Sequence, residues 1–348
     1  MEKSIRPASQ DLGPTLDSTV ARSNRHTIEV RVHPRLPVLC ALVIILTPKS
    51  ALSALNAQEK EFKSVVQKMV KDQSTLRARQ SFTPVDTSPY FDIPVTYNTK
   101  VKWWINYFQT SGRKWFRTWL ERSSAYLPNM KKVLSERGLP QDLAYVAMIE
   151  SGFSPHATST ASAVGYWQFI TPTANRYGLR TTWWLDERRD FTKSTAAASR
   201  YLGDLFKQFS SWYLTAAAYN MGEGRTQRLV KRYGTKNYWI LSKKADFPDE
   251  TRQYIPKLLG AMLIAKAPNL YGFRDLNPKA PYSFDYFRVP GGTDLHNLAG
   301  YLGIQPAQLT RLNPELVKGF VPSSIKSHKI RVPKGLTGKV AQFIRAQL

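Results

Sequence analysis

Cysteine is almost absent from the 348-residue sequence: Cys40 is the single one, and it lies inside an apolar run near the N-terminus. One cysteine excludes an internal disulfide framework and any zinc site built from several thiolates. The five histidines are scattered, so no spacing indicates a metal site, and no glycine-rich phosphate loop occurs. We therefore expect neither a metal nor another cofactor.

Long hydrophobic stretches are also missing, because the longest apolar run covers residues 36–46 and is too short to span a bilayer comfortably. Arginines precede this run and small residues follow it, at Ala51–Ser53 and Ala57, which is typical of a secretory signal. We interpret residues 1–57 as a signal peptide with a long basic n-region, and an uncleaved anchor is the alternative. Export would place the protein in the periplasm or cell envelope, or outside the cell.

Acidic residues are scarce, with 25 Asp and Glu against 50 Lys and Arg and a formal net charge of +25. The basic excess is spread along the chain and favours an anionic partner such as nucleic acid, an acidic membrane face or an acidic polymer. Export argues against nucleic acid. We therefore expect an anionic polymer outside the cytoplasm, with peripheral association with the membrane or the wall as a second expectation.

The rest of the sequence divides by its periodicity into helical and mixed parts. Residues 58–100 combine a short amphipathic helix with an extended, proline-containing connector, and residues 101–275 show helical patterns broken at Gly, Pro or Asn. Residues 283–336 are predicted as strand, two short helices and strand, and residues 337–348 as a C-terminal helix or tail. The predicted fold class is mainly α, a large helical domain followed by a small βααβ domain.

Between Glu150 and Asp186 the sequence contains no acidic residue, although enzymes that cut glycosidic bonds usually need two carboxylates. Glu150 falls in the predicted last turn of an apolar helix that stops at Gly152. The negative end of the helix macrodipole and the apolar neighbours should raise the pKa of Glu150, which suits a general acid. The alternative is an ordinary exposed glutamate at a helix end.

Three motifs extend the hypothesis beyond one residue: IESGFSPHATSTASAVGYWQF at 149–169, AYNMGEGR at 218–225 and ETRQYIPKLL at 250–259. In their order and intervals they resemble the goose-type-lysozyme-like lytic transglycosylases, and within that family the membrane-bound lytic murein transglycosylase D branch. The resemblance covers residues 91–272. It implies a lysozyme-like helical catalytic domain at 101–275 that cleaves the glycan strands of peptidoglycan.

The resemblance also implies roles for single residues. Glu150 matches the family's sole catalytic acid/base, and its substrate-binding positions match Ser151, Ser159, Gln168, Tyr219, Asn220 and Tyr254. From the residues themselves, Trp167 is the best candidate for an aromatic platform under a sugar. Ser154, Tyr166 and Met221 depart from the family pattern, and these departures concern the groove, not the acid.

One acid suffices if the sugar supplies the nucleophile. Attack of the C6 hydroxyl on C1 replaces the second carboxylate by proximity, and the resemblance implies 1,6-anhydromuramoyl ends at the cleaved MurNAc–GlcNAc β-1,4 bond. Glu223 is a nearby-motif carboxylate that could complicate this scheme. Hydrolysis by a captured water on the same fold (a lysozyme-type muramidase) and a non-catalytic wall-binding scaffold are the alternative functions.

The C-terminal unit at residues 283–336 resembles a LysM peptidoglycan-binding module. Matching positions include Val289 and Gly292 near its start, and Leu312–Pro314 and Val332–Pro333 toward its end. The usual GDTL is replaced by GGTDL, so we expect wall binding, with a degenerate structural appendage as the alternative. The expected partner is the peptidoglycan glycan strand, and we expect a monomer.

Overall fold

The computed structural model describes residues 29–30, 57, 60–69 and 91–347. The predicted signal peptide therefore lies outside the described residues, apart from 29–30 and residue 57, and so does most of the predicted connector. No helix in these described ranges is both long and apolar enough to cross a membrane.

The described part of the chain begins with small elements that pack beside the main domain. β1 (Glu29–Val30) pairs antiparallel with β2 (Val95–Thr96). Residues 60–69 form a helix, as predicted, and its side chains Phe62 and Met69 are buried in the main hydrophobic core. This segment is thus part of the larger unit.

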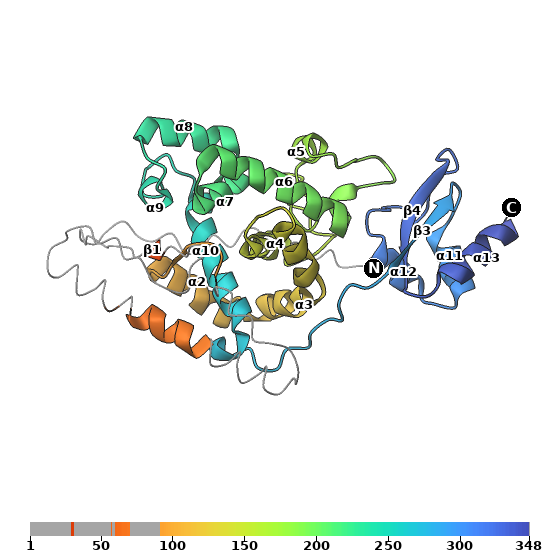
Figure 1. The fold of residues 1–348 in the computed structure, drawn as a ribbon, viewed down its shortest axis with the longest axis horizontal. Helices are drawn as coiled ribbons and strands as arrows, with labels where there is room; N and C mark the ends of the chain where they lie inside the picture. Colours follow the sequence, from red (N-terminus) through yellow and green to blue (C-terminus); the bar gives the residue numbers. More distant parts are fainter. Residues whose placement is uncertain (1–28, 31–56, 58–59, 70–90, 348) are drawn as a thin grey trace.

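Helices build that larger unit (Figure 1). Its α-helices are α2 (Thr99–Gln109), α3 (Arg113–Ser135), α4 (Ala144–Ser151), α5 (Thr171–Arg176), α6 (Phe191–Phe209), α7 (Trp212–Met221), α8 (Glu223–Tyr233), α9 (Tyr238–Leu241) and α10 (Asp249–Lys266). Short 3₁₀ turns connect them, at η1 (Gln141–Leu143), η2 (Glu187–Arg189) and η3 (Pro268–Tyr271). The predicted mainly α class is confirmed.

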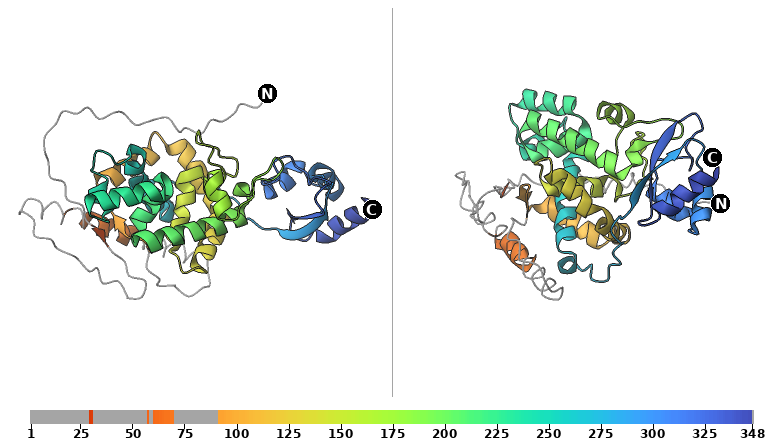
Figure 2. Two further views of the ribbon diagram at one scale, coloured as in Figure 1. Left: turned by 90° about the horizontal axis from the view of Figure 1, so that it is seen from above. Right: turned by 45° about the vertical axis from the view of Figure 1, so that its right-hand side comes forward.

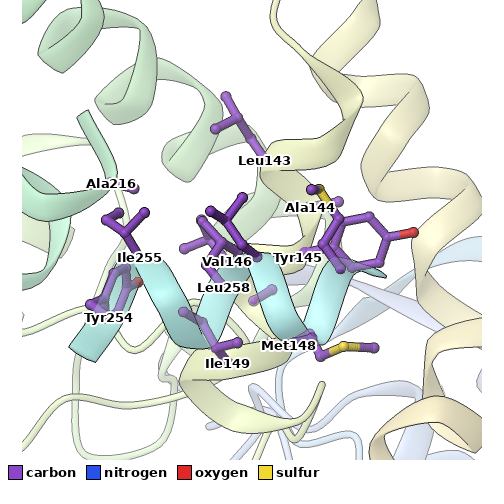
Figure 3. Packing of buried hydrophobic residues seen from close by; sticks show 14 of the residues in the cluster. Leu143, Ala144, Tyr145, Val146, Met148, Ile149, Ala216, Tyr254, Ile255 and Leu258 are labelled. Atoms are coloured by element: carbon purple, nitrogen blue, oxygen red, sulfur yellow. The ribbon is translucent and has the colours of Figure 1, made fainter. Parts of the chain in front are cut away.

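The centre of this unit is the contact between α4 and α10 (Figure 3). Every residue of α4 from Ala144 to Ile149 is buried, so this helix is enclosed on all sides. α10 contributes Ile255 and Leu258 to the same core. Glu150, the next residue of α4, therefore lies at the edge of the core.

Reciprocal hydrogen bonds fix the start of α4. The carboxylate of Asp92 accepts from the backbone N–H groups of Gln141 (2.5 Å) and Asp142 (2.9 Å), and the carboxylate of Asp142 accepts from the N–H of Asp92 (3.0 Å). Lys266 Nζ, at the end of α10, lies 2.6 Å from Asp142 Oδ1. The segment FDIP at 91–94 thus holds η1, and through it α4, in place.

The C-terminal unit has the predicted βααβ order, which is confirmed: β3 (Asp285–Pro290), α11 (Leu295–Leu302), α12 (Pro306–Leu312) and β4 (Ser327–Val332). The strands pair antiparallel, with Asp285 opposite Val332 and Pro290 opposite Ser327. α13 (Thr337–Gln347) follows and contributes Val340 and Phe343 to a second hydrophobic core. This unit lies at one end of the helical unit (Figure 2).

The two units are docked against each other as well as joined by the chain. Trp184 and Leu185, which precede η2, are buried in the core of the C-terminal unit. The N–H of Asp186 donates to the carbonyl of Glu315 (2.8 Å), and the N–H of Val317 donates to the carbonyl of Trp184 (3.0 Å). No local pattern in the sequence predicts this docking.

A buried ion cluster completes the junction. Arg331 of β4 places Nη2 2.5 Å from Asp190 of the helical unit and Nη1 2.8 Å from Glu315 of its own unit. All these side chains are buried. Asp190 also caps α6, because its carboxylate accepts from the N–H of Lys193 (2.8 Å). The cluster therefore links the C-terminal sheet directly to a long helix of the larger unit.

Candidate active site

Glu150 lies in the last turn of α4, as the sequence predicted. Gly152 ends the helix with a φ of 57°, in the left-handed region that favours glycine. A Cβ on Gly152 would lie 2.0 Å from the ring of Trp119 of α3, so the close packing also requires glycine. The helix that carries Glu150 is thus fixed at both of its ends.

Tyr254 of α10 contacts the carboxyl group directly: its hydroxyl donates to Glu150 Oε1 at 2.5 Å. Burial raises the pKa of Glu150 to about 7, the hydrogen bond from Tyr254 and the charge of Lys257 oppose this rise, and the charge of Glu250 adds to it. Near neutral pH the carboxyl is therefore present in both forms. Such a group can donate a proton in one step and accept one in the next.

Tyr219 of α7 connects this pair to the segment that follows α4. Its hydroxyl donates to the backbone carbonyl of Trp167 at 2.7 Å. Burial and the neighbouring Glu150 raise the pKa of Tyr219 well above its ordinary value, so the hydroxyl stays a donor. Glu150, Tyr219 and Tyr254, predicted from separate motifs, are thus brought together.

Trp167 is not a sugar platform, and that prediction is wrong. Its side chain is 0% exposed, and Nε1 donates to Thr195 Oγ1 of α6 at 3.1 Å. A ring enclosed by the core has no free face for a ligand. Trp167 contributes to the site through its carbonyl, which accepts the hydrogen bond from Tyr219.

Ser151, Ser159 and Gln168 shape the loop after α4 through bonds within it. The hydroxyl of Ser151 donates to the carbonyl of Tyr166 (2.8 Å), and the hydroxyl of Ser159 accepts from the N–H of Ala163 (3.1 Å). Gln168, with a φ of 50°, donates from Nε2 to two carbonyls of the same loop, those of Ala157 (3.1 Å) and Gly165 (2.9 Å). These bonds fix the shape of the loop that follows Glu150 in the chain.

Arg188 of η2 binds the same loop through its backbone carbonyls. Its guanidinium donates to the carbonyls of Ser162 (3.1 Å) and Phe169 (3.2 Å). Gly165 lies against the backbone of Arg188, where a Cβ would come within 2.0 Å of the carbonyl oxygen. The loop and the segment that receives the C-terminal unit are therefore one packed structure.

Asn220 lies at the end of α7 and binds α10. Its Nδ2 donates to Glu250 Oε1 (2.9 Å), and its Oδ1 accepts from the hydroxyl of Thr251 (2.6 Å). Asn220 thus fixes Glu250, an exposed carboxylate whose charge reaches Glu150.

Glu223, the other motif carboxylate, is in an ion pair. Arg176 lies 2.6 Å from Glu223 Oε1, and the hydroxyl of Tyr201 donates to Oε2 at 2.8 Å. Burial alone would raise the pKa of Glu223, but the bonds from Arg176 and Tyr201 outweigh it and lower the pKa. An ionised, paired carboxylate is a poor proton donor, which makes Glu223 less suited than Glu150 to act as an acid.

Glu250 and Lys257 are site residues that the sequence analysis missed. Both belong to the motif ETRQYIPKLL, and both modify the pKa of Glu150. Glu250 lies four residues before Tyr254 and Lys257 three residues after it. Residues at these spacings share one face of a helix, so the motif, taken as a helix, places both beside Tyr254.

The arrangement suits acid–base chemistry by one carboxyl group supported by tyrosines. Within the part of the chain that the structure describes, no group of three or more His, Cys, Asp and Glu side chains is arranged to hold a metal ion. The residues around Glu150 offer hydroxyl, amide and carbonyl groups, which are suited to hydrogen bonding with a polyhydroxylated ligand.

Two protein families match parts of the chain. Residues 129–242 match the Transglycosylase SLT domain, and residues 283–347 match the LysM-like domain of lytic transglycosylase MltD. The first match contains Glu150, Gln168 and Tyr219, and the second contains the complete βααβ unit and α13.

Curated relatives and a solved structure resemble parts of the chain. Membrane-bound lytic murein transglycosylase D of Escherichia coli K12 is 34% identical over 218 residues, covering 61% of this chain and 47% of the relative. Membrane-bound lytic murein transglycosylase C of Sodalis glossinidius is 27% identical over 147 residues, 38% of this chain and 41% of the relative. The 70 kDa soluble lytic transglycosylase of E. coli has a TM-score of 0.38 at 21% identity, covering 53% of this chain and 33% of that one. The chain spans about half the length of the curated relatives it matches.

Proposed function

We propose that this chain, which contains a transglycosylase SLT domain followed by an MltD-type LysM-like domain, is a peptidoglycan lytic transglycosylase. It would cleave the MurNAc–GlcNAc β-1,4 bond and leave 1,6-anhydromuramoyl ends. The observation that carries the proposal is the state of Glu150: a carboxyl with a pKa of about 7, hydrogen-bonded by Tyr254 at the end of a buried helix. A lytic murein transglycosylase that is 34% identical supports it.

In the proposed reaction Glu150 acts twice. First its proton passes to the glycosidic oxygen of GlcNAc, and the bond from that oxygen to C1 of MurNAc breaks with its electron pair on the oxygen. Then the C6 hydroxyl attacks C1 and loses its proton to the carboxylate of Glu150, which regenerates the acid. Water takes no part, and proximity within the sugar replaces a second carboxylate.

Tyr254 and Tyr219 would support Glu150 in both proton transfers. The hydrogen bond from Tyr254 stabilises the carboxylate that forms after the first proton transfer, and it restricts the rotamer of the side chain. Tyr219 holds the carbonyl of Trp167 and with it the loop. We place Ser151, Ser159, Gln168 and Asn220 along the path of the glycan, where they shape and orient the polar edges of the groove.

The C-terminal unit would hold the enzyme on its insoluble substrate. Its match to a LysM-like domain and the net charge of +25 support binding to an anionic wall polymer. The membrane-bound relatives support a location in the cell envelope. We propose that the protein works there as a monomer on glycan strands, with the signal segment at 1–57 directing export.

Mass spectrometry of the soluble products from purified peptidoglycan tests the reaction. The proposal predicts muropeptides with anhydromuramoyl ends, each lighter by one water than the corresponding reducing-end product. Reducing ends alone would show a lysozyme-type hydrolase, and binding without any released product would show a wall-binding scaffold.

A further inference from the structure

Lys257 is a charged residue of α10 that lies against the end of α4. Its Nζ donates to the backbone carbonyl of Ile149 at 3.2 Å. The same Nζ lies 5.8 Å from the ring centroids of both Trp104 and Trp119, so its charge faces two aromatic rings. A lysine in this setting is held in one place instead of moving freely in solvent.

The carbonyl that Lys257 binds belongs to the residue directly before Glu150. Ile149 lies in the last turn of α4, where carbonyl groups lack partners within the helix. Phe153, the residue from which an i→i+4 bond would come, has a φ of 59° and has left the helix. Lys257 therefore satisfies a carbonyl at the position that sets the direction of the Glu150 side chain.

We propose that Lys257 is a positioning residue for the proposed reaction. By holding the carbonyl of Ile149, it keeps the carboxyl of Glu150 within hydrogen-bonding distance of Tyr254. The inference rests on the proposed role of Glu150. Lys257 touches neither the substrate nor the reacting atoms in this scheme. It acts through the backbone of α4 and through its charge.

The charge of Lys257 belongs to a small set of groups that face Glu150. From α10 these are Glu250, Tyr254 and Lys257, and from α7 Tyr219. Lys257 favours the carboxylate and Glu250 favours the neutral acid. Arg122 of α3 donates to the carbonyl of Gly152 at 3.4 Å, and its charge acts on His156. Removing Lys257 should therefore raise the pKa of Glu150, even though burial lowers the pKa of Lys257 itself.

The test compares Lys257→Met and Lys257→Arg with the wild type in the full chain. Methionine keeps the apolar stem without the charge, and arginine keeps both charge and donor. Initial rates on purified peptidoglycan, measured across pH, should fall at high pH when Glu150 loses its proton. In Lys257→Met this fall should move to higher pH by about one unit, at the lower edge of a neighbouring-charge effect. The maximal rate should drop by up to about 100-fold with KM little changed.

Lys131→Met is the matched control. Lys131 is another partly buried lysine, with Nζ 5.3 Å from the ring centroid of Tyr145 of α4, but it faces Asp142 and Asp92 instead of Glu150. Its replacement should leave the high-pH fall where it is. Arginine at 257 should restore most of the rate. An unchanged fall in Lys257→Met, or an equal shift in Lys131→Met, would overturn the inference.

A readout without catalysis separates this inference from the proposed function. The ¹³C signal of the Glu150 carboxyl, assigned by its loss in Glu150→Gln, can be titrated in wild type and Lys257→Met. A higher midpoint in the variant supports the action of Lys257 on Glu150 even if the wild type makes hydrolytic products. An identical midpoint refutes it even if anhydromuramoyl products are found.

Discussion

At the scale of single residues, the acid at the end of α4 is the feature on which the function depends. Glu150→Gln keeps the size of the side chain but can neither donate nor accept the proton. The loss of general acid–base catalysis lowers rates by about 10²–10⁴-fold, and the upper part of that range is expected because one residue serves both steps. Initial rates on peptidoglycan measure it. Activity above about a tenth of wild type would mean that another group is the catalyst.

The same residue should make stability depend on pH. The pKa of Glu150 in the folded protein, about 7, lies above its ordinary value of 4.5, so the native state binds the proton more tightly than the unfolded chain. The stabilisation is complete below the ordinary pKa and is lost as pH rises through the folded one. Melting curves between about pH 5 and pH 8 should therefore show a decline in Tm that Glu150→Gln lacks. If Tm changes with pH in the same way in both proteins, the Glu150 carboxyl is not buried with a raised pKa.

Tyr254→Phe removes the one hydrogen bond that the structure gives to the Glu150 carboxyl from a neighbouring helix. Such a bond to an ionised group contributes about 1.5–3 kcal/mol, which corresponds to a rate loss of roughly 10–100-fold. Because the bond lowers the pKa of Glu150, its loss should also move the high-pH fall upward. Tyr213→Phe, which loses bonds to Pro94 and Thr96, is the control and should leave that fall unchanged.

Single residues also show the limits of sequence reasoning. Glu150 could be found because its motif and the end of its helix can be read locally, at Gly152. The role of Trp167 could not, because composition does not reveal which way a loop tryptophan points. Its ring turns inward to reach Thr195, a residue of a helix that begins later in the chain. Exposure of a side chain is decided by tertiary packing.

At the scale of elements, α10 supplies three groups to one acid. Glu250, Tyr254 and Lys257 follow one face of the helix at spacings of four and three residues. The sequence analysis placed this segment in the helical part of the chain, where α10 lies, and the motif identified Tyr254. The charged residues of this helix shift the pKa of Glu150, and the periodicity of the apolar residues alone does not reveal them.

Glu250→Gln should act in the direction opposite to Lys257→Met. Removing this negative charge favours the ionised form of Glu150, so the high-pH fall of the rate should move to lower pH. The amide oxygen of glutamine can still accept the bond from Asn220, which keeps the rim of the site in place. The matched control is Asp249→Asn, an exposed acid paired with Arg252. A shift upward, or the same shift in the control, would contradict the sign of the interaction.

At the scale of the whole molecule, the C-terminal unit is part of the structure behind the active site. Trp184 and Leu185 fill its core, and the η2 residue Arg188 that follows them holds the loop that follows Glu150. The sequence predicted both units but not their docking. Arg331 and Asp190 lie far apart in the chain, and no local pattern marks a pair of that kind.

Arg331→Met should destabilise the folded protein through this junction. The change leaves the carboxylates of Asp190 and Glu315 buried without their cation. Removing one partner of a buried ion pair lowers stability by about 3–5 kcal/mol. Chemical denaturation of the full chain measures the free energy of unfolding. Arg288→Met is the control on the partner strand, because Arg288 is exposed and binds only the hydroxyl of Ser327 there. The control should change stability by about 0.5 kcal/mol or less. If Arg331→Met is as stable as the control, the ion cluster does not hold the two units together.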